Sequence, residues 1–464
     1  MVSTDTTLFD YATNTRLILR ADVLTPGYMP PKPIGRIDQI CEVAGLIEHL
    51  FQRGSPNNAL VFGPPGSGKT MITNYVLRSL YAKIAEMIAE RDNLLKLDEL
   101  DNLSEDDAMK LSELQIQIPT SNVKWCYVLC KKYNTSAGIL HKLIFDIDPH
   151  TAIKRSGIPL DTYYDELYRL MKLKNTSLII ILDEIDYLSS DDILYNFTRA
   201  TANIEIAGQF ISVWGLSNSV KYEKTLDERV ISSAGFEKLH FPSYGTNEIY
   251  HILKDRVDYA LSPDAIDEDT LLKCASNAAQ NGGDVRKALT VLKTAAETAN
   301  KLKMNKISFD VLRSAEDKVM ANEVMAAVLK LQRKHQLVLL AIMKLLSYRK
   351  SATTGQVAKV FNFLIDKHNE LNPDSILENR DRYFTKRALK VLETLDIITT
   401  EMISQGRGRG RTTYEYVDQL DVAPIFSSIY SDYVLCDLEG YDPIENNQAI
   451  LFDENRGKAK PVKT

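Results

Sequence analysis

The chain has 464 residues, of which 44% are hydrophobic and 25% charged, and its formal net charge at pH 7 is −6. These proportions are typical of a soluble globular protein of two or three domains. No apolar run is long enough to span a bilayer, and residues 1–30 lack the basic start and apolar core of a signal peptide, so we expect neither a membrane-spanning nor a secreted protein.

The five cysteines are few and scattered, as suits a reducing compartment. We therefore expect an intracellular protein without a membrane partner, in the cytoplasm or nucleoid, or in the nucleus if the source is eukaryotic. Because the net charge is negative, any binding to nucleic acid must come from a local basic surface.

The first element with a chemical signature is the stretch ALVFGPPGSGKT at residues 59–70. An apolar strand end precedes the glycines and an amphipathic helix follows them, which is the context of a phosphate-binding loop. Glycines let backbone N–H groups turn toward phosphate oxygens, and the helix presents its positive dipole end to the same anion. We expect a nucleoside triphosphate to be bound by Gly63, Pro64, Pro65, Gly66, Ser67, Gly68, Lys69 and Thr70.

Within this loop, Lys69 can reach the β- and γ-phosphates, and the Thr70 hydroxyl can ligate Mg²⁺. An acidic segment follows: residues 86–113 hold ten Asp or Glu against three Lys or Arg, with leucines at helical spacing. We interpret residues 86–118 as a helical insertion or an acidic solvated flap without chemistry. Further on, Cys126 and Cys130 lie in the apolar segment KWCYVLCKK without a second cysteine pair, so we expect core residues rather than a zinc site.

The second half of the site is predicted from SLIIILDEIDYL, residues 177–188, a fully buried strand that ends in acidic residues. Asp183 can hold Mg²⁺ directly or through water, and Glu184 can orient and deprotonate an attacking water. A solvated acidic turn is the alternative. The next strand, in residues 209–218, ends at Asn218, which would lie beside Asp183 if the two strands are neighbours. An amide there can position water or sense the γ-phosphate, and a simple strand-end turn is the alternative.

Residues 241 to about 318 are predicted to be helical and poor in strands. In this region NGGDVRKALTVLKTAAE begins a helix after two glycines and Asp284, a good N-cap. Arg286 occupies the first turn, where the helix dipole disfavours a cation. That position is expected if the arginine serves a phosphate.

Three helices and two short strands are predicted from residue 331 onward, which together make a winged helix–turn–helix. Thr353 and Gln356 form a capping box at the start of the second helix. The apolar face of the third helix is predicted to consist of Phe384, Ala388, Val391, Leu392 and Leu395.

Residues 331–416 hold fifteen Lys or Arg against nine Asp or Glu, so the predicted winged domain is locally basic. Lys386 and Lys390 lie opposite the apolar face of the third helix, with Arg387 at its edge. Such a helix can lie in a major groove while wing residues reach phosphates or the minor groove. The wing residues predicted for DNA contact are Arg407, Arg409 and Arg411. A solvated helix face, a flexible charged turn and a protein contact are the alternatives.

The motifs GPPGSGKT, LDEID, GLSNS, LDERVISS and GGDVRKAL, in this order and spacing, resemble those of the AAA+ ATPases. More narrowly, they resemble the archaeal-type replication initiators that are related to eukaryotic origin-recognition and helicase-loading subunits. The resemblance covers roughly residues 15–420 and includes the lead-in TPGYMPPKPIGRIDQI, similar to the family's segment beside the adenine.

The resemblance implies an α/β fold: an AAA+ P-loop NTPase core with a parallel sheet and a helical lid, followed by a C-terminal winged helix–turn–helix domain. The implied domains are a nucleotide-binding core (1–240), a lid (241–328), a winged helix domain (329–422) and a C-terminal tail (423–464). The acidic segment and the tail depart from the family pattern, and the sequence assigns neither a role.

The resemblance also implies roles for individual residues. It places Tyr244 and Arg256 against the nucleotide and makes Asn218 the first sensor and Arg286 the second. Arg229, in LDERV, would reach the γ-phosphate of a neighbouring subunit. The alternative for Arg229 is a surface arginine paired with Asp227 or Glu228.

A second DNA element of the family, a helical insertion, corresponds to residues 146–167, with Lys154 and Arg155 as its candidate contacts. A basic loop between helices gives the same pattern.

By this resemblance the chain is expected to be an ATP-dependent DNA-binding replication initiator and a weak, switch-like ATPase that uses ATP or ADP with Mg²⁺. Its expected partners are double-stranded origin DNA, a replicative helicase that it helps to recruit or load, and paralogous or identical AAA+ neighbours. Hydrolysis would be supported by Glu184, Asn218, Arg286 and Arg229. The alternatives are a nucleotide-bound scaffold subunit that seldom hydrolyses ATP and an AAA+ ATPase of another role, such as a clamp-loader, transposition or signalling NTPase.

Overall fold

The computed structural model describes residues 17–98, 103–200, 208–347, 351–373, 376–377, 382–395, 397–404 and 410–416, together with Ile429, Leu435 and Leu438. It divides into two compact units, Met1–Leu312 and Arg313–Thr464. Across these described residues, no helix combines the length and apolar character needed to cross a membrane.

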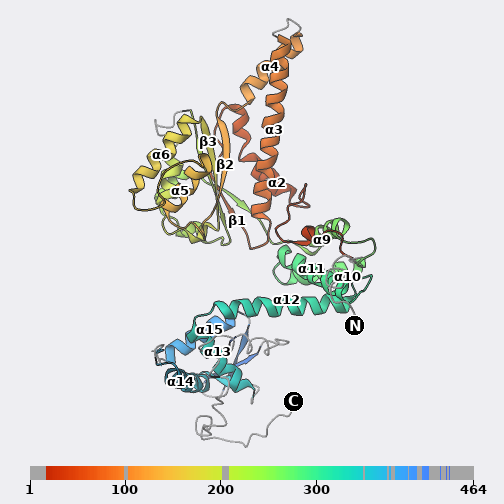
Figure 1. Cartoon of the computed structure of the whole chain (residues 1–464), viewed down its shortest axis with the longest axis vertical. Coiled ribbons are helices and arrows are strands. Elements are labelled where there is room, and N and C mark those ends of the chain that lie inside the picture. The colour runs from red at the N-terminus through yellow and green to blue at the C-terminus, as the bar shows by residue number, and fades with distance from the viewer. Residues whose placement is uncertain are drawn as a thin grey trace, which may run out of the picture. The chain divides into compact units, whose positions relative to one another are not determined.

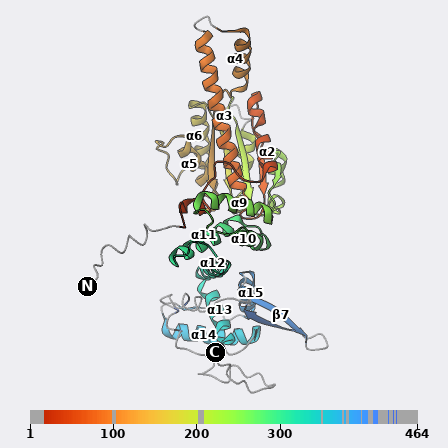
Figure 2. The ribbon, with the colours of Figure 1, turned by 90° about the vertical axis from the view of Figure 1, so that its right-hand side faces the viewer.

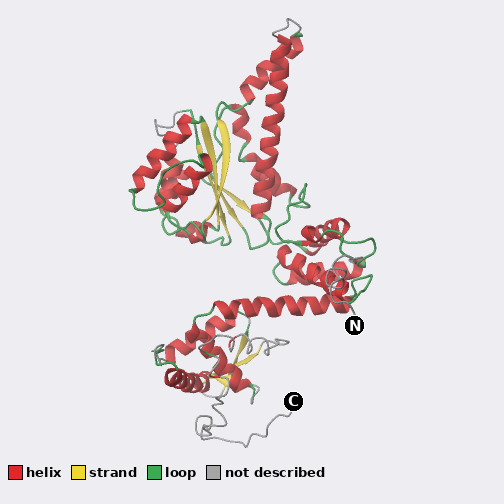
Figure 3. Cartoon of the chain, viewed as in Figure 1, coloured by secondary structure: helices red, strands yellow, loops and turns green. Residues whose placement is uncertain are grey.

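The first unit contains a parallel sheet between helices (Figure 3). The sheet has five strands in the order β2-β3-β4-β1-β5. Its strands are β1 (Ala59–Phe62), β2 (Asn122–Leu129), β3 (Thr176–Asp183), β4 (Ile211–Ser217) and β5 (Glu237–His240). The predicted buried run in residues 178–182 lies in β3 and is fully buried. This burial follows because a central strand of a parallel sheet is covered on both faces.

Helices cover both faces of the sheet (Figure 1). The helices on one face are α2 (Ile37–Gly45) and α3 (Lys69–Asp98), and those on the other are α5 (Ser136–Ile147), α6 (Leu160–Leu173), α7 (Asp192–Ala200) and α8 (Glu228–Ala234). Successive residues of β3 alternate between the two cores, because side chains of a strand point to opposite faces. Ile179 packs in the core beneath α2 and α3, whereas Ile180 packs beneath α5 and α6. Both cysteines predicted for the core, Cys126 and Cys130, are buried on the α5–α6 side.

The acidic segment forms a helical hairpin. Helix α3 continues for 30 residues to Asp98, and α4 (Glu105–Gln117) packs back along it (Figure 2). Ser104 caps α4 by accepting a hydrogen bond from the backbone N–H of Asp107. A small core between the two helices consists of Met87, Leu94, Leu111, Leu114 and Ile118. The leucines at helical spacing therefore hold the hairpin together while its acidic residues lie outside.

After β5 the chain becomes helical. The helices are α9 (Thr246–Ala260), α10 (Glu268–Gln280), α11 (Val285–Lys301) and α12 (Phe309–Lys330), the last of which runs into the second unit. Asp284 caps α11 as predicted, since its side chain accepts from the backbone N–H of Arg286. Short 3₁₀ turns lie at Ala21–Leu24, Glu48–Gln52, Ile185–Tyr187 and Tyr222–Thr225.

The second unit has the predicted winged arrangement, with one addition. Its helices are α13 (Arg333–Leu346), α14 (Thr354–Leu371) and α15 (Arg382–Thr394), and its strands are β6 (Ala352–Thr353), β7 (Ile398–Ser404) and β8 (Gly410–Tyr416). The three strands form an antiparallel sheet in the order β6-β8-β7, so the short β6 joins the two predicted strands. The capping box of Thr353 and Gln356 is present at the start of α14.

The predicted apolar face of α15 was wrong at one position. Val391 is 38% exposed, whereas Leu389, which the prediction left out, is fully buried. The buried face is centred on Ala388, Leu389 and Leu392, and residues three and four apart lie on one side of a helix. Val391 lies four residues after Arg387 and therefore shares the exposed side with it.

Candidate functional site

A cleft of about 530 Å³ lies at the carboxyl ends of β3 and β4. Its walls are the loop between β1 and α3, the N-terminal segment 26–34, and residues of α9 and α11. The carboxyl ends of parallel strands are where open α/β sheets place their ligands. Most of the residues predicted for phosphate and metal contact line this cleft: Pro65, Gly66, Ser67, Gly68, Lys69, Thr70, Asp183, Glu184 and Asn218. Gly63 and Pro64, which were also predicted, are not among the residues that line it; their carbonyl oxygens accept hydrogen bonds from Lys69.

The glycines of the phosphate loop leave no room for a side chain. Gly66 and Gly68 have φ angles of 73° and 92°, in the left-handed region that favours glycine. A Cβ on Gly68 would lie 2.5 Å from the Tyr244 hydroxyl, and one on Gly66 would lie 1.9 Å from a carboxylate oxygen of Asp284. The loop can therefore approach a ligand with its backbone, as a phosphate cradle requires.

Lys69 lies at the centre of the cleft and is 7% exposed. Its ammonium donates to the carbonyl oxygens of Gly63 at 2.7 Å and Pro64 at 3.0 Å, and to Oδ1 of Asn218 at 2.9 Å. Burial lowers the pKa of Lys69 to about 8, although the nearby Asp183 carboxylate acts in the opposite direction. Lys69 thus joins the phosphate loop to the end of β4.

Thr70 and Asp183 form the part of the cleft that suits a metal ion. The Thr70 hydroxyl donates to Oδ2 of Asp183 at 2.9 Å, and the backbone N–H of Glu184 donates to Oδ1 at 2.9 Å. Glu184 has a left-handed φ of 52°, and its Oε2 atom is buried without a hydrogen-bond partner among the described residues. Hydroxyl and carboxylate oxygens are the ligands that Mg²⁺ prefers, so these residues fit that ion.

The described part of the chain contains no cluster of three or more His, Cys, Asp or Glu that could hold a metal by itself. A magnesium ion in this cleft would therefore take further ligands from phosphate oxygens and water, as is usual for phosphate-loop proteins.

Sequence reasoning missed Tyr127, which also contacts Asp183. Tyr127 lies on β2, and its hydroxyl donates to Oδ2 of Asp183 at 2.5 Å. Burial, and then the hydrogen bond to Asp183, raises the pKa of Tyr127, so the hydroxyl stays protonated and can donate. The tyrosine could not be recognised from its own segment, because only the pairing of β2 with β3 brings it to Asp183.

The two predicted sensors lie in the cleft on different elements. β3 and β4 are neighbours, which is the condition under which Asn218 was expected beside Asp183. The backbone N–H of Asn218 donates to Asp186 at 3.1 Å, and this anchors the end of β4. Arg286, in the first turn of α11, lines the cleft and pairs with Asp284 at 3.2 Å. That carboxylate offsets the unfavourable position of Arg286 at the positive end of a helix.

Two arginines on this side of the first unit are buried: Arg256, which lines the other half of the cleft, and Arg36, which lies against the cleft residue Tyr244. Arg256 is 4% exposed, and its guanidinium lies 4.7 Å from the centre of the Tyr28 ring. Its Nε and Nη1 atoms are buried and make no hydrogen bond within the described ranges. Arg36, which the sequence did not single out, lies 3.9 Å from the centre of the Tyr244 ring and donates to the carbonyl oxygen of Pro242 at 2.5 Å. Unpaired buried donors are costly, so a ligand with acceptor atoms suits Arg256.

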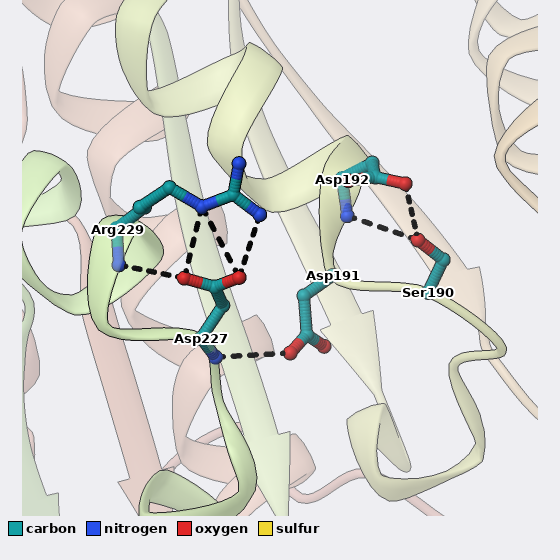
Figure 4. Close-up of polar contacts among 5 residues, drawn as sticks. All are labelled: Ser190, Asp191, Asp192, Asp227 and Arg229. Carbon is teal, nitrogen blue, oxygen red and sulfur yellow. Dashed lines mark hydrogen bonds and ion pairs between the residues drawn. The ribbon is translucent and has the colours of Figure 1, made fainter.

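Arg229 lies on α8 and points toward Asp227 (Figure 4). It is absent from the residues that line the cleft and is 73% exposed. Its guanidinium donates to both carboxylate oxygens of Asp227, with the shortest contact at 2.7 Å. The Arg229 hydrogen bonds lower the pKa of Asp227 to about 2. Asp227 in turn donates its backbone N–H to Asp191 at 3.3 Å. In this chain, therefore, the surface pair with Asp227 that was the alternative for Arg229 is formed.

The candidate DNA contacts whose side chains the structure describes are all exposed. Lys154 and Arg155 lie in the loop between α5 and α6 rather than on a helix, and Tyr163 donates to the Lys154 carbonyl oxygen at 2.9 Å. Lys386, Arg387 and Lys390 are all exposed on α15. Arg411 lies in β8, but its side chain, like the whole of Arg407 and Arg409, lies outside the described residues.

The sheet, the phosphate loop, the helices after β5 and the winged unit together define an ATPase of the AAA+ class with a C-terminal winged helix domain. Family models match in the same order: an AAA domain at residues 52–215, a Cdc6 AAA+ ATPase-type lid domain at 250–317, and a CDC6 C-terminal winged helix domain at 326–422.

Among curated proteins, the chain is 30% identical over 414 residues to ORC1-type DNA replication protein 4 of Haloarcula marismortui, covering 84% of this chain and 77% of that one. It is 27% identical over 439 residues to ORC1-type DNA replication protein 1 of Archaeoglobus fulgidus, covering 94% and 96%. Among solved structures, it resembles the Aeropyrum pernix ORC1 protein in complex with DNA, with a TM-score of 0.70, 25% identity, and 91% and 99% coverage. The chain belongs to the family of ORC1-type DNA replication proteins.

Proposed function

We propose that this protein is a replication initiator that binds origin DNA under the control of the nucleotide in its cleft and helps to recruit or load the replicative helicase. The observation that carries this proposal is the convergence of separate segments on one cleft. Lys69 and Thr70 come from the phosphate loop, Asp183 and Glu184 from the end of β3, and Arg286 from α11. A ligand that touches all of them would couple the sheet to the lid helices.

In this proposal Thr70 and Asp183 hold Mg²⁺, which when bound neutralises part of the phosphate charge. Lys69 contacts the β- and γ-phosphates, and Glu184 orients the attacking water and accepts its proton. Asn218 helps to position the water or the γ-phosphate. One buried oxygen of Glu184 has no hydrogen-bond partner in the described part of the chain. This is consistent with such a role, because a buried carboxylate oxygen needs a donor or a cation.

On the lid side, Arg286 would exchange Asp284 for the γ-phosphate, so the lid would respond to the state of the nucleotide. Tyr244 and Arg256 would contact the nucleotide in the other half of the cleft. Arg229, which is exposed, would reach the nucleotide of a neighbouring AAA+ subunit after leaving Asp227. Hydrolysis in this arrangement is slow and acts as a switch.

DNA binding is proposed for the winged unit and for the loop between α5 and α6. The related Aeropyrum pernix ORC1 protein was solved in complex with DNA. In this chain Lys386, Arg387 and Lys390 form an exposed basic surface on α15, which suits a helix that enters a major groove. Lys154 and Arg155, with the wing arginines Arg407, Arg409 and Arg411, would add contacts to the backbone of the duplex.

Footprinting on the organism's own candidate origins, in ATP and in ADP, tests the proposal. We expect a defined footprint whose extent or affinity differs between the two nucleotides. The variant Lys69→Ala should lose this difference, whereas Lys83→Ala, which changes an exposed lysine of the same helix, should keep it. Uniform binding along all duplexes in both nucleotides would contradict the proposal.

A further inference from the structure

We propose that Tyr127 is a positioning residue for the metal half of the cleft, whose hydroxyl holds the Asp183 carboxylate in the orientation in which Asp183 and Thr70 present oxygen atoms to a divalent cation. This inference rests on the proposed nucleotide-binding function. It concerns a residue of β2, whereas the phosphate loop follows β1 and the acidic residues lie at the end of β3.

Both oxygens of the Asp183 carboxylate are held by donors from different segments. Oδ1 accepts from the backbone N–H of Glu184 at 2.9 Å. Oδ2 accepts from the Thr70 hydroxyl at 2.9 Å and from the Tyr127 hydroxyl at 2.5 Å. A carboxylate held on both oxygens cannot rotate freely, so each donor contributes to its orientation.

Tyr127 is the donor in this set that reaches Asp183 from a neighbouring strand. In the parallel pairing of β2 with β3, Tyr127 lies opposite Ile181 and Leu129 lies opposite Asp183. The tyrosine side chain therefore spans an offset of two residue positions along the sheet, toward the cleft that it lines. A shorter polar side chain at this position would not span that distance.

Packing of the ring alone does not explain why this position carries a tyrosine. Its ring is half-buried, and phenylalanine would fill the same space, so packing alone does not require the hydroxyl. The hydroxyl donates to a carboxylate, and hydrogen bonds to charged groups are the stronger ones. Removing the hydroxyl is expected to loosen Asp183 without leaving a cavity.

The test is the Mg²⁺ dependence of ATP binding in Tyr127→Phe, measured by titration calorimetry at a series of Mg²⁺ concentrations and in excess EDTA. Loss of a residue that orients a metal ligand typically costs about 10-fold or more in metal affinity. We expect the Mg²⁺ concentration at half-saturation to rise about 10-fold, while the ATP affinity in EDTA stays within about twofold of the unaltered protein. Tyr187→Phe, which removes the hydroxyl of an exposed tyrosine outside the cleft, is the matched control and should change neither value.

A second measurement separates orientation of Asp183 from a general effect. In an Asp183→Asn background, adding Tyr127→Phe should shift the Mg²⁺ curve by less than about twofold, because the two residues act through one contact. An unchanged Mg²⁺ curve in the single variant, or an equal loss of ATP affinity with and without metal, would overturn the inference. If the unaltered protein bound no ATP at all, the proposed function would fall, and this inference with it.

Discussion

The cleft and the exposed face of α15 both carry the charges on which the proposed function depends, but they hold them differently. In the cleft, Lys69 is 7% exposed, and its ammonium donates to the carbonyl oxygens of Gly63 and Pro64 and to the side chain of Asn218. On α15, Lys386, Arg387 and Lys390 are exposed to solvent and screened by salt. A charge in the cleft is therefore expected to act with large, specific effects, and a charge on α15 with small, additive, salt-dependent ones.

The largest effect is expected from Glu184→Gln, which keeps the shape of the side chain but removes the proposed base. A positioned general base contributes roughly 10²- to 10⁴-fold to a rate, so single-turnover hydrolysis should fall at least about 100-fold while ATP affinity changes by less than about threefold. If the hydrolysis rate is unchanged in this variant, the protein is a nucleotide-bound scaffold subunit instead of a hydrolysing switch. An unchanged rate would also contradict the expectation that charges in the cleft have larger and more specific effects than charges on α15.

The next effect is structural and concerns Arg36, whose side chain is 3% exposed. Arg36→Lys should leave the carbonyl of Pro242 poorly satisfied and remove the stacking on Tyr244, because a lysine cannot reproduce a planar guanidinium. We expect the free energy of unfolding of the first unit to fall by about 2 kcal/mol, measured by urea denaturation. The exposed Arg20→Lys is the control and should shift it by less than about 0.5 kcal/mol. Equal shifts in the two variants would contradict the structural role of Arg36.

A smaller effect is expected at the start of α14. Thr353→Ala removes the capping box with Gln356, and loss of such a cap costs about 1 kcal/mol. The unfolding transition of the winged unit should move to lower denaturant accordingly, whereas Thr394→Ala, near the end of α15, should move it less. A transition unchanged by Thr353→Ala would mean that β6 alone fixes the start of α14.

The smallest effect is expected on α15. Lys390→Ala should weaken binding to duplex DNA by only a few-fold, and it should reduce the slope of log affinity against log salt by about 0.9 if Lys390 contacts one phosphate. Val391→Ala, at the adjacent exposed position, should change neither the affinity nor the slope. A large loss of affinity with an unchanged salt slope would show that Lys390 reads a base instead of contacting a phosphate.

Much of the site was predictable because its signals are local. The phosphate loop, the acidic end of β3 and the caps at Asp284 and Thr353 each depend on residues within a few positions of one another. The order of the sheet was not predictable in this way, so Tyr127 was missed although its apolar segment was recognised as part of the core.

Other residues were missed or misassigned either because their partners are distant in the sequence or because a local pattern does not fix the geometry. Arg36 lies more than 200 residues from its partners Pro242 and Tyr244, so no local pattern connects them. Val391 was assigned to the wrong side of α15 because helical spacing gives a face but does not fix its centre. For Arg229 the sequence left a pair with Asp227 and a role in a neighbouring subunit open, and a single chain can display only the first.

The proposed function depends first on one cleft, organised around Lys69, that binds the nucleotide. Titration calorimetry of ATP in Mg²⁺ with Lys69→Ala and the control Lys83→Ala measures this directly. Because a buried, charge-assisted contact is lost, we predict that Lys69→Ala weakens ATP binding by about 10- to 100-fold and that Lys83→Ala leaves it unchanged. Equal affinities in Lys69→Ala and the unaltered protein would contradict the claim.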